Sequence, residues 1–351
     1  MILEAVQRYV QLTWKRLAGV IKLAVAGGLV TYLISSGKID ASSLSELVSL
    51  RSALLAMLCG GTIIVAQLVR ALRLRLILEA TGIHVRWWDC VRNVLVGFFF
   101  NNFLPTAAGG DLVVGYRFAK SMNGRLPDIA GSLLYDRLLG MAALSFLASC
   151  ALFSLWLHAF GFAWPGKLGW GFLGMACALS CSLPILALCR SESVLRVLQQ
   201  VASRYLLLRP VTDLVARFLG VGFHKNLLVK CFGISCIMHI LSCLALYLAG
   251  RAANQEVAMA QTILLGLPTF LLGIAPLSPG NIGWQEWFGY VVWSSQNLAF
   301  GASLWLIYRM IAATASLVGA LVYASETWWG SIDESGVLST SVGRGQSGAL
   351  R

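Results

Sequence analysis

A polar break inside a long apolar region constrains the fold of this chain more than any other feature. Residues 101–111 have the sequence NNFLPTAAGGD and end the apolar run 91–104. Pro105 removes a backbone donor, and the Gly109-Gly110 pair weakens helix formation. Lipid cannot hydrogen-bond the backbone groups that such a break releases, so irregular backbone at membrane depth must be buried in protein or line a water-filled cavity. We therefore expect this segment to line a polar site between helices.

A second break of the same kind occurs at residues 276–286, PLSPGNIGWQE. The apolar run 91–104 has 14 residues, fewer than the ~20 that a helix needs to cross the hydrocarbon of a bilayer. Each break is therefore predicted to be the turn of a re-entrant hairpin or of a pair of broken helices.

Composition sets the class of protein. The chain of 351 residues is 58% hydrophobic and 12% charged, about half the charge of an ordinary soluble domain. The sequence predicts an all-α polytopic membrane protein with six full spans and two broken helical hairpins, or eight spans if the hairpins cross fully. We expect a cytoplasmic amphipathic N-terminus at 1–16, a transmembrane domain at 17–324 and a disordered cytoplasmic tail at 325–351. The six full spans are predicted at 17–34, 53–69, 129–157, 170–189, 227–249 and 302–324.

The distribution of basic residues predicts the topology. With a cytoplasmic N-terminus and hairpins that return to their own side, the cytoplasmic segments hold 20 of the 27 Lys and Arg residues and the external loops hold 4. This asymmetry follows the positive-inside rule and predicts an inner (plasma) membrane protein with both termini in the cytoplasm. The net charge of +12 then indicates contact with the anionic cytoplasmic leaflet rather than with nucleic acid. We interpret Arg70, Arg73 and Arg75 as anchors at this interface.

The two breaks share an order of chemical features. Asp111 ends the first break and precedes the intramembrane Arg137 by 26 residues, and Glu286 ends the second break and precedes the intramembrane Arg309 by 23 residues. Because the predicted topology brings the two breaks in from opposite sides, the order indicates an inverted repeat. Broken segments at corresponding positions of such repeats form the central site of many transporters.

These residues resemble the flippase-like family that is typified by the transmembrane domain of lysylphosphatidylglycerol synthases. The resemblance implies an all-helical membrane domain that moves a polar-headgroup lipid, such as a phospholipid, a polyprenyl-phosphate-linked lipid or a hopanoid, between leaflets, beside a lipid-synthesis enzyme. Asp136 and Gln285 depart from the family pattern, which has Glu and Arg there. The substrate-binding residues expected on this basis are Asn102, Pro105, Gly109, Gly110, Asp111, Arg117, Asp136, Arg137, Pro279, Gly280, Gly283, Glu286 and Arg309.

The chemistry of these charges supports a binding site and leaves one structural alternative. A charge at bilayer depth costs ~2.5–3.5 kcal/mol on the insertion scale, so each must find a partner or water. The planar fork of arginine suits a phosphate. In the alternative, Asp136 with Arg137 and Glu286 with Arg309 are ion pairs that only lock helices together.

Two other functions are compatible with the sequence. One is a membrane enzyme that acts on a lipid phosphate with Asp111 and Glu286 as acid and base. The other is a non-transporting partner of a lipid-modifying enzyme. Cys236, His239 and Cys243 share a helical face but lack a fourth ligand for a metal ion. We expect transport rather than catalysis, without cofactor or metal.

Overall fold

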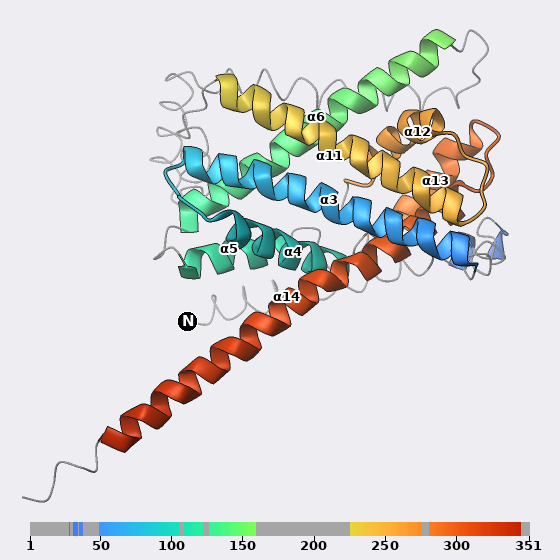
Figure 1. Cartoon of the computed structure of the whole chain (residues 1–351). Coiled ribbons are helices and arrows are strands. Elements are labelled where there is room, and N and C mark those ends of the chain that lie inside the picture. Colours follow the sequence, from blue (N-terminus) through green and yellow to red (C-terminus); the bar gives the residue numbers. More distant parts are fainter. Residues whose placement is uncertain are drawn as a thin grey trace, which may run out of the picture.

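The structure is a computed structural model that describes residues 28, 31–33, 35–37, 49–104, 109–121, 126–158, 225–274 and 281–344. Throughout these ranges the regular secondary structure is helical (Figure 1). The all-α membrane fold is thereby confirmed. The main helices are α3 (Leu50–Ala80), α4 (Trp87–Phe103), α5 (Gly109–Ser121), α6 (Leu126–His158), α11 (Lys225–Ala252), α12 (Met259–Leu272), α13 (Trp284–Ser294) and α14 (Gly301–Arg344).

Four of the described helices contain segments long and apolar enough to cross a membrane. They match four of the six predicted full spans, and the other two, at 17–34 and 170–189, lie wholly or mostly outside the described residues. α14 continues to Arg344, past residue 325, where the sequence predicts the start of a disordered tail. The four segments are Leu50–Ala80, Leu126–Leu155, Asn226–Ala252 and Gly301–Glu326.

Helices α4 and α5 form one short hairpin, and α12 and α13 form another. The longest of the four, α4, has 17 residues, which gives about 26 Å of helix against ~30 Å of hydrocarbon. Both ends of the first hairpin lie where α3 ends and α6 begins, and the second hairpin lies at the opposite end of the bundle (Figure 1). The two short hairpins therefore enter the bundle from opposite ends.

The two halves of the chain repeat one arrangement in opposite directions. Helices α3 to α6 correspond in order to α11 to α14: α4 packs against α14 as α12 packs against α6, and α3 and α11 pack against each other. Corresponding helices, such as α3 and α11, run in opposite directions (Figure 1). The inverted repeat predicted from the two breaks is therefore present in the packing of the helices.

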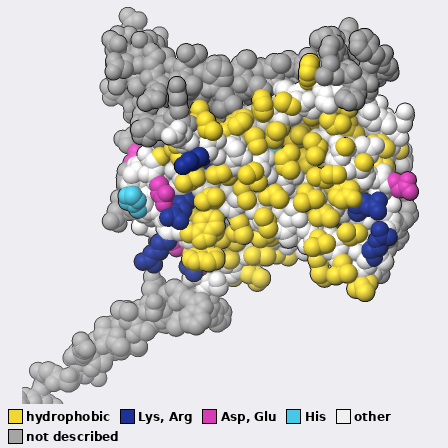
Figure 2. Space-filling view, turned by 45° about the horizontal axis from the view of Figure 1, so that its top comes forward, with side chains coloured by type: hydrophobic (Ala, Val, Ile, Leu, Met, Phe, Trp, Pro, Cys, Tyr) yellow, Lys and Arg dark blue, Asp and Glu magenta, His cyan; other side chains and the backbone are white. Residues whose placement is uncertain are grey.

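The surface of the bundle fits a lipid environment. Figure 2 shows a face covered by hydrophobic side chains, with charged side chains at its two ends. Exposed apolar residues of this kind include Leu54, Met57 and Val65 on α3 and Ile237 on α11. We call the end where α3 ends and α6 begins the basic end. Its described basic residues include Arg75, Arg86, Arg92, Arg117 and Lys120.

A close approach of two glycines holds the first hairpin together. A Cβ placed on Gly110 of α5 would overlap the carbonyl oxygen of Gly97 on α4. The Gly110 N–H donates to Asn101 Oδ1 at 3.0 Å, which satisfies one of the free donors at the start of α5. The glycines thus bring α4 and α5 together and fix the position of the residues that follow Gly110.

We expect Gly110→Ala to destabilise the protein, because the new methyl group meets backbone that cannot move aside without separating α4 from α5. Overpacking of this kind costs about 1–3 kcal/mol, and the thermal unfolding midpoint of the protein in detergent measures it. Gly61→Ala is the matched control, since a Cβ at Gly61, within α3, meets nothing within 4 Å. Equal midpoints for the two variants would contradict the close approach.

Candidate functional site

Five charged side chains from three helices meet inside the bundle. The fully buried Asp136 accepts hydrogen bonds from Arg73 Nε at 2.7 Å and from Arg70 Nε at 3.3 Å. Arg70 Nη2 also donates to Asp111 at 3.1 Å, and Arg137 Nε donates to the other oxygen of Asp111. Each carboxylate therefore has two guanidinium partners. We call these five residues the central network.

The central network lies well below the ends of the helices. Arg70 is ten residues before the end of α3, and Arg137 is eleven residues after the start of α6, so both are about 15 Å from the basic end. Asp111 reaches this depth because it stands in the first turn of α5, at the inner end of the hairpin. The positive end of the helix dipole favours a carboxylate there.

A cavity of about 310 Å³ opens beside the central network. Arg137 is 41% exposed although it lies inside the bundle, whereas Asp136 is 0% exposed. Only Nε of Arg137 forms a hydrogen bond with another described residue, so its remaining donors are available in the cavity. The polar residues that line the cavity are Gln67, Arg70, Arg73, Asn101, Asp136, Arg137, His239 and Ser242.

The corresponding pair of the second half is bound differently. Arg309 Nε donates to Glu286 at 2.5 Å, and its Nη2 donates to the Asn281 carbonyl at 2.9 Å and to Gln285 at 3.1 Å. Glu286 also accepts the Gly283 N–H at 2.8 Å, where Gly283 has a φ of 79° that suits glycine. Neither Arg309 nor Glu286 lines the cavity beside the central network. This cluster fastens the second break to α14.

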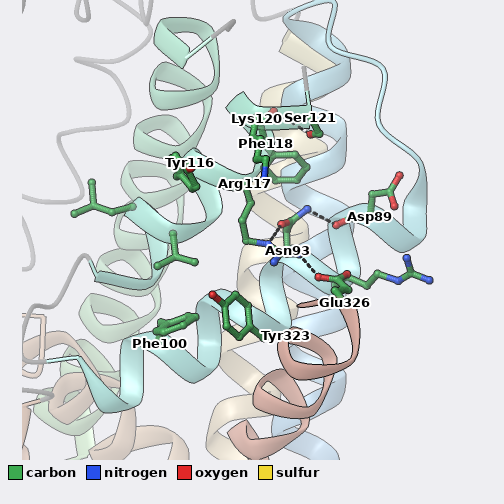
Figure 3. Close-up of a pocket in the computed structure, with 13 residues that line it drawn as sticks. Asp89, Asn93, Phe100, Tyr116, Arg117, Phe118, Lys120, Ser121, Tyr323 and Glu326 are labelled. Atoms are coloured by element: carbon green, nitrogen blue, oxygen red, sulfur yellow. Dashed lines mark hydrogen bonds and ion pairs between the residues drawn. The ribbon is translucent and has the colours of Figure 1, made fainter. Parts of the chain in front are cut away.

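Arg117 lies in a third place, at the basic end. Its Nε donates to Asn93 at 2.6 Å, and its Nη2 donates to Glu326 of α14 at 2.5 Å. Figure 3 shows these contacts at the wall of a cavity of about 990 Å³ between α4, α5 and α14. We call this the outer cavity.

The predicted site residues thus separate into groups. Asp111, Asp136 and Arg137 come together as expected. The structural alternative pairs Asp136 with Arg137, but Asp136 accepts its hydrogen bonds from Arg73 and Arg70 instead. The other predicted residues lie elsewhere or outside the described ranges. Glu286, Gly283 and Arg309 form the second cluster, Arg117 lines the outer cavity, Gly109 and Gly110 begin α5, and Pro105, Pro279 and Gly280 are not among the described residues.

The sequence interpretation misses two residues of the site, Arg70 and Arg73. The sequence predicts both as interfacial anchors, but both are members of the central network, and Arg73 is 2% exposed. Asn101 lines the central cavity, whereas Asn102 donates back to the Phe98 carbonyl of its own helix at 2.9 Å. The sequence does contain a signal for these arginines, because the intramembrane carboxylates Asp111 and Asp136 require cationic partners.

The Cys and His residues of α11 lie within the packed bundle. His239 Nε2 lies 3.0 Å from the Gly140 carbonyl oxygen, and Cys243 is buried in the core. Within the described ranges, no three His, Cys, Asp or Glu side chains are grouped so as to hold a metal ion.

Comparison with protein families identifies the family of the chain. The family model described as the lysylphosphatidylglycerol synthase transmembrane region matches residues 19–320, which include both hairpins and the central network. No curated protein matches the chain.

Proposed function

Because the chain belongs to the family of the lysylphosphatidylglycerol synthase transmembrane region, a family of membrane proteins linked to lipid handling, we propose that it moves a lipid with an anionic headgroup between leaflets. The observation that carries this proposal is the exposure of Arg137 to a cavity inside an apolar bundle. A charge held at this depth serves a binding function more readily than it serves packing, because it costs stability.

The charges around the cavity favour a phosphate. The central network has three guanidinium groups and two carboxylates, so one positive charge is left without a negative partner within the network. One phosphodiester supplies the missing negative charge, and its oxygens accept hydrogen bonds from the arginine fork. Phospholipids and polyprenyl-phosphate-linked lipids fit this requirement better than hopanoids without phosphate.

Because Asp111 has two guanidinium partners, Arg137 can exchange Asp111 for a phosphate and later return to it. Asp111 accepts hydrogen bonds from Arg137 and from Arg70. When a phosphate binds Arg137, Asp111 keeps Arg70 as its partner, so the exchange leaves no buried carboxylate unpaired. The headgroup crosses through the polar cavity while the acyl chains stay in the bilayer.

We place the basic end in the cytoplasm. It holds most of the described exposed basic residues, and cytoplasmic segments carry an excess of Lys and Arg. Arg51 and Arg251 are the described basic residues near the opposite end. In this orientation the first hairpin enters from the cytoplasmic side of the inner membrane and the second from the outside.

Transport of fluorescent lipids in proteoliposomes tests the proposal. Vesicles that contain the chain alone are compared with empty vesicles, using phosphatidylglycerol, phosphatidylcholine and a polyprenyl phosphate, and a membrane-impermeant quencher measures how much label moves between leaflets. We expect transfer of the anionic lipids by the wild type and at least tenfold slower transfer by Arg137→Gln.

The same vesicles separate the two alternatives. A lipid that stays in its leaflet but is chemically changed would replace the translocator with the membrane enzyme. If no lipid moves and none is changed, the chain is a non-transporting partner, and a lipid-modifying enzyme should then be recovered with it.

A further inference from the structure

The outer cavity carries features of a second binding site. It is lined by residues of α4, α5 and α14, and three cations, Arg92, Arg117 and Lys120, line it together with Asp89 and Glu326. Arg92 and Lys120 are exposed and form no ion pair with another described residue. As in the central network, the cations exceed the carboxylates by one.

One wall of the outer cavity is apolar. Leu112 and Tyr116 of α5 are 72% and 68% exposed, and Phe100 and Tyr323 also line the space. An anion alone needs no such wall, whereas a lipid needs both a cationic site for its headgroup and apolar surface for its chains. The side chains in Figure 3 show this division, with Arg117 and Lys120 on α5 and the rings of Phe100 and Tyr323 below them.

The carboxylate of Glu326 occupies the position beside Arg117 that a phosphate would take. Glu326 accepts from Arg117 Nη2 at 2.5 Å, and Asn93 holds Nε at 2.6 Å, so Arg117 is oriented by a neutral side chain and neutralised by a carboxylate. The two charged side chains are 21% and 31% exposed, so water and ligands reach them. A phosphate has the same charge sign and the same kind of acceptor oxygens as that carboxylate.

The basic side chains of α5 at the outer cavity have no counterpart in the second half of the inverted repeat. The helix of the second half that corresponds to α5 is α13, with the sequence WQEWFGYVVWS, which contains no Lys or Arg. Because the two halves otherwise repeat the same packing, the arrangement of the helices does not require the basic side chains of α5. They point to a function at the basic end only.

We propose that the outer cavity binds the phosphate headgroup of a lipid from the leaflet at the basic end, and that Glu326 closes this site by competing with the phosphate for Arg117. The inference rests on the proposed function only for the class of ligand. It assigns to Arg117 and Glu326 opposite effects on binding, which a simple structural ion pair does not have.

The test is a titration of the full chain, in an uncharged detergent, with dihexanoyl phosphatidylglycerol, dihexanoyl phosphatidylcholine and inorganic phosphate. It is done in the Arg137→Gln background, which removes the exposed arginine of the central cavity. We expect Arg117→Gln to weaken binding of the anionic lipid about tenfold, the value of one charged hydrogen bond. Glu326→Gln is expected to tighten it severalfold.

Further variants make the result independent of folding. Lys120→Gln, at an exposed position, is expected to weaken binding about threefold without changing the thermal midpoint. Arg75→Gln and Glu79→Gln are the matched controls, because this pair on α3 is also exposed, at 37% and 32%, and lies outside the cavity. Both controls are expected to leave binding within about twofold of the background.

Other outcomes overturn the proposal. Weaker binding in both Arg117→Gln and Glu326→Gln shows that Glu326 positions the arginine and does not compete, and no change in either shows that the cavity is not the site. Inorganic phosphate that binds as tightly as the lipid makes this a site for free anions. If Arg137→Gln loses transport and Arg117→Gln has no effect on lipid binding, only this site is rejected. If the lipid binds in the outer cavity but no lipid is transported, only the translocator is rejected.

Discussion

Asp136→Asn is expected to lower the free energy of unfolding by about 3–5 kcal/mol, because it leaves a buried guanidinium without its countercharge. Arg73 is 2% exposed, and its Nη1 also donates to the hydroxyl of Ser235 at 2.7 Å. Asparagine has nearly the same shape as aspartate, so the loss reports the charge and not the packing. Chemical or thermal unfolding of the purified protein in detergent measures it.

A double variant distinguishes this cause from general damage to the core. Arg73→Met removes the buried cation, so Arg73→Met with Asp136→Asn is expected to be more stable than Asp136→Asn alone, as is found when both members of a buried pair are replaced. Glu79→Gln on the same helix is the control, since its exposed pair with Arg75 is worth at most about 1 kcal/mol. Losses that simply add in the double variant would contradict a buried pair between Arg73 and Asp136.

The sequence predicts much of the fold because lipid imposes strict local rules. Apolar runs give the spans 53–69, 129–157, 227–249 and 302–324, all of which lie largely within observed helices. Pro and Gly inside apolar sequence locate the breaks that separate α4 from α5 and α12 from α13. These are properties of short segments, and a single sequence displays them without knowledge of the packing.

The central network was only partly predictable, because its pairing is set by packing over long distances in the chain. Asp136 bonds to Arg73, 63 residues earlier, and no local pattern specifies that contact. Hydropathy falls after Val69, which is why the sequence predicts that the following arginines lie at the membrane surface. The helix instead continues to Ala80 and carries Arg70 and Arg73 past the buried side of α6.

The two halves of the repeat have the same helices but different charges. Asp136 precedes Arg137 in α6, whereas Tyr308 precedes Arg309 at the corresponding place in α14. The first half therefore has a second buried carboxylate, and two arginines of α3 reach it. The fold supplies two matching breaks, and these additional charges make the site of the first half different from that of the second.

This difference predicts different effects for two arginines that stand at corresponding places in the sequence: Arg137→Gln affects transport, and Arg309→Gln affects stability. Arg137→Gln is expected to slow lipid transport at least tenfold with a small change in the thermal midpoint, because Asp111 keeps Arg70 as its partner. Arg309→Gln is expected to lower the midpoint clearly. It removes the hydrogen bonds from Arg309 to Glu286 and to the Asn281 carbonyl, which hold the second break, and leaves the buried Glu286 without its cation.

The measurement is transport per folded molecule, set beside the unfolding midpoint of the same sample. For Arg309→Gln we expect transport per folded molecule within about twofold of the wild type, because Arg309 does not line the central cavity, whereas loss of a charged hydrogen bond to the lipid costs tenfold or more. Equal loss of transport in both variants, at unchanged stability, would mean that the headgroup contacts both arginines. The binding path would then extend from the first break to the second.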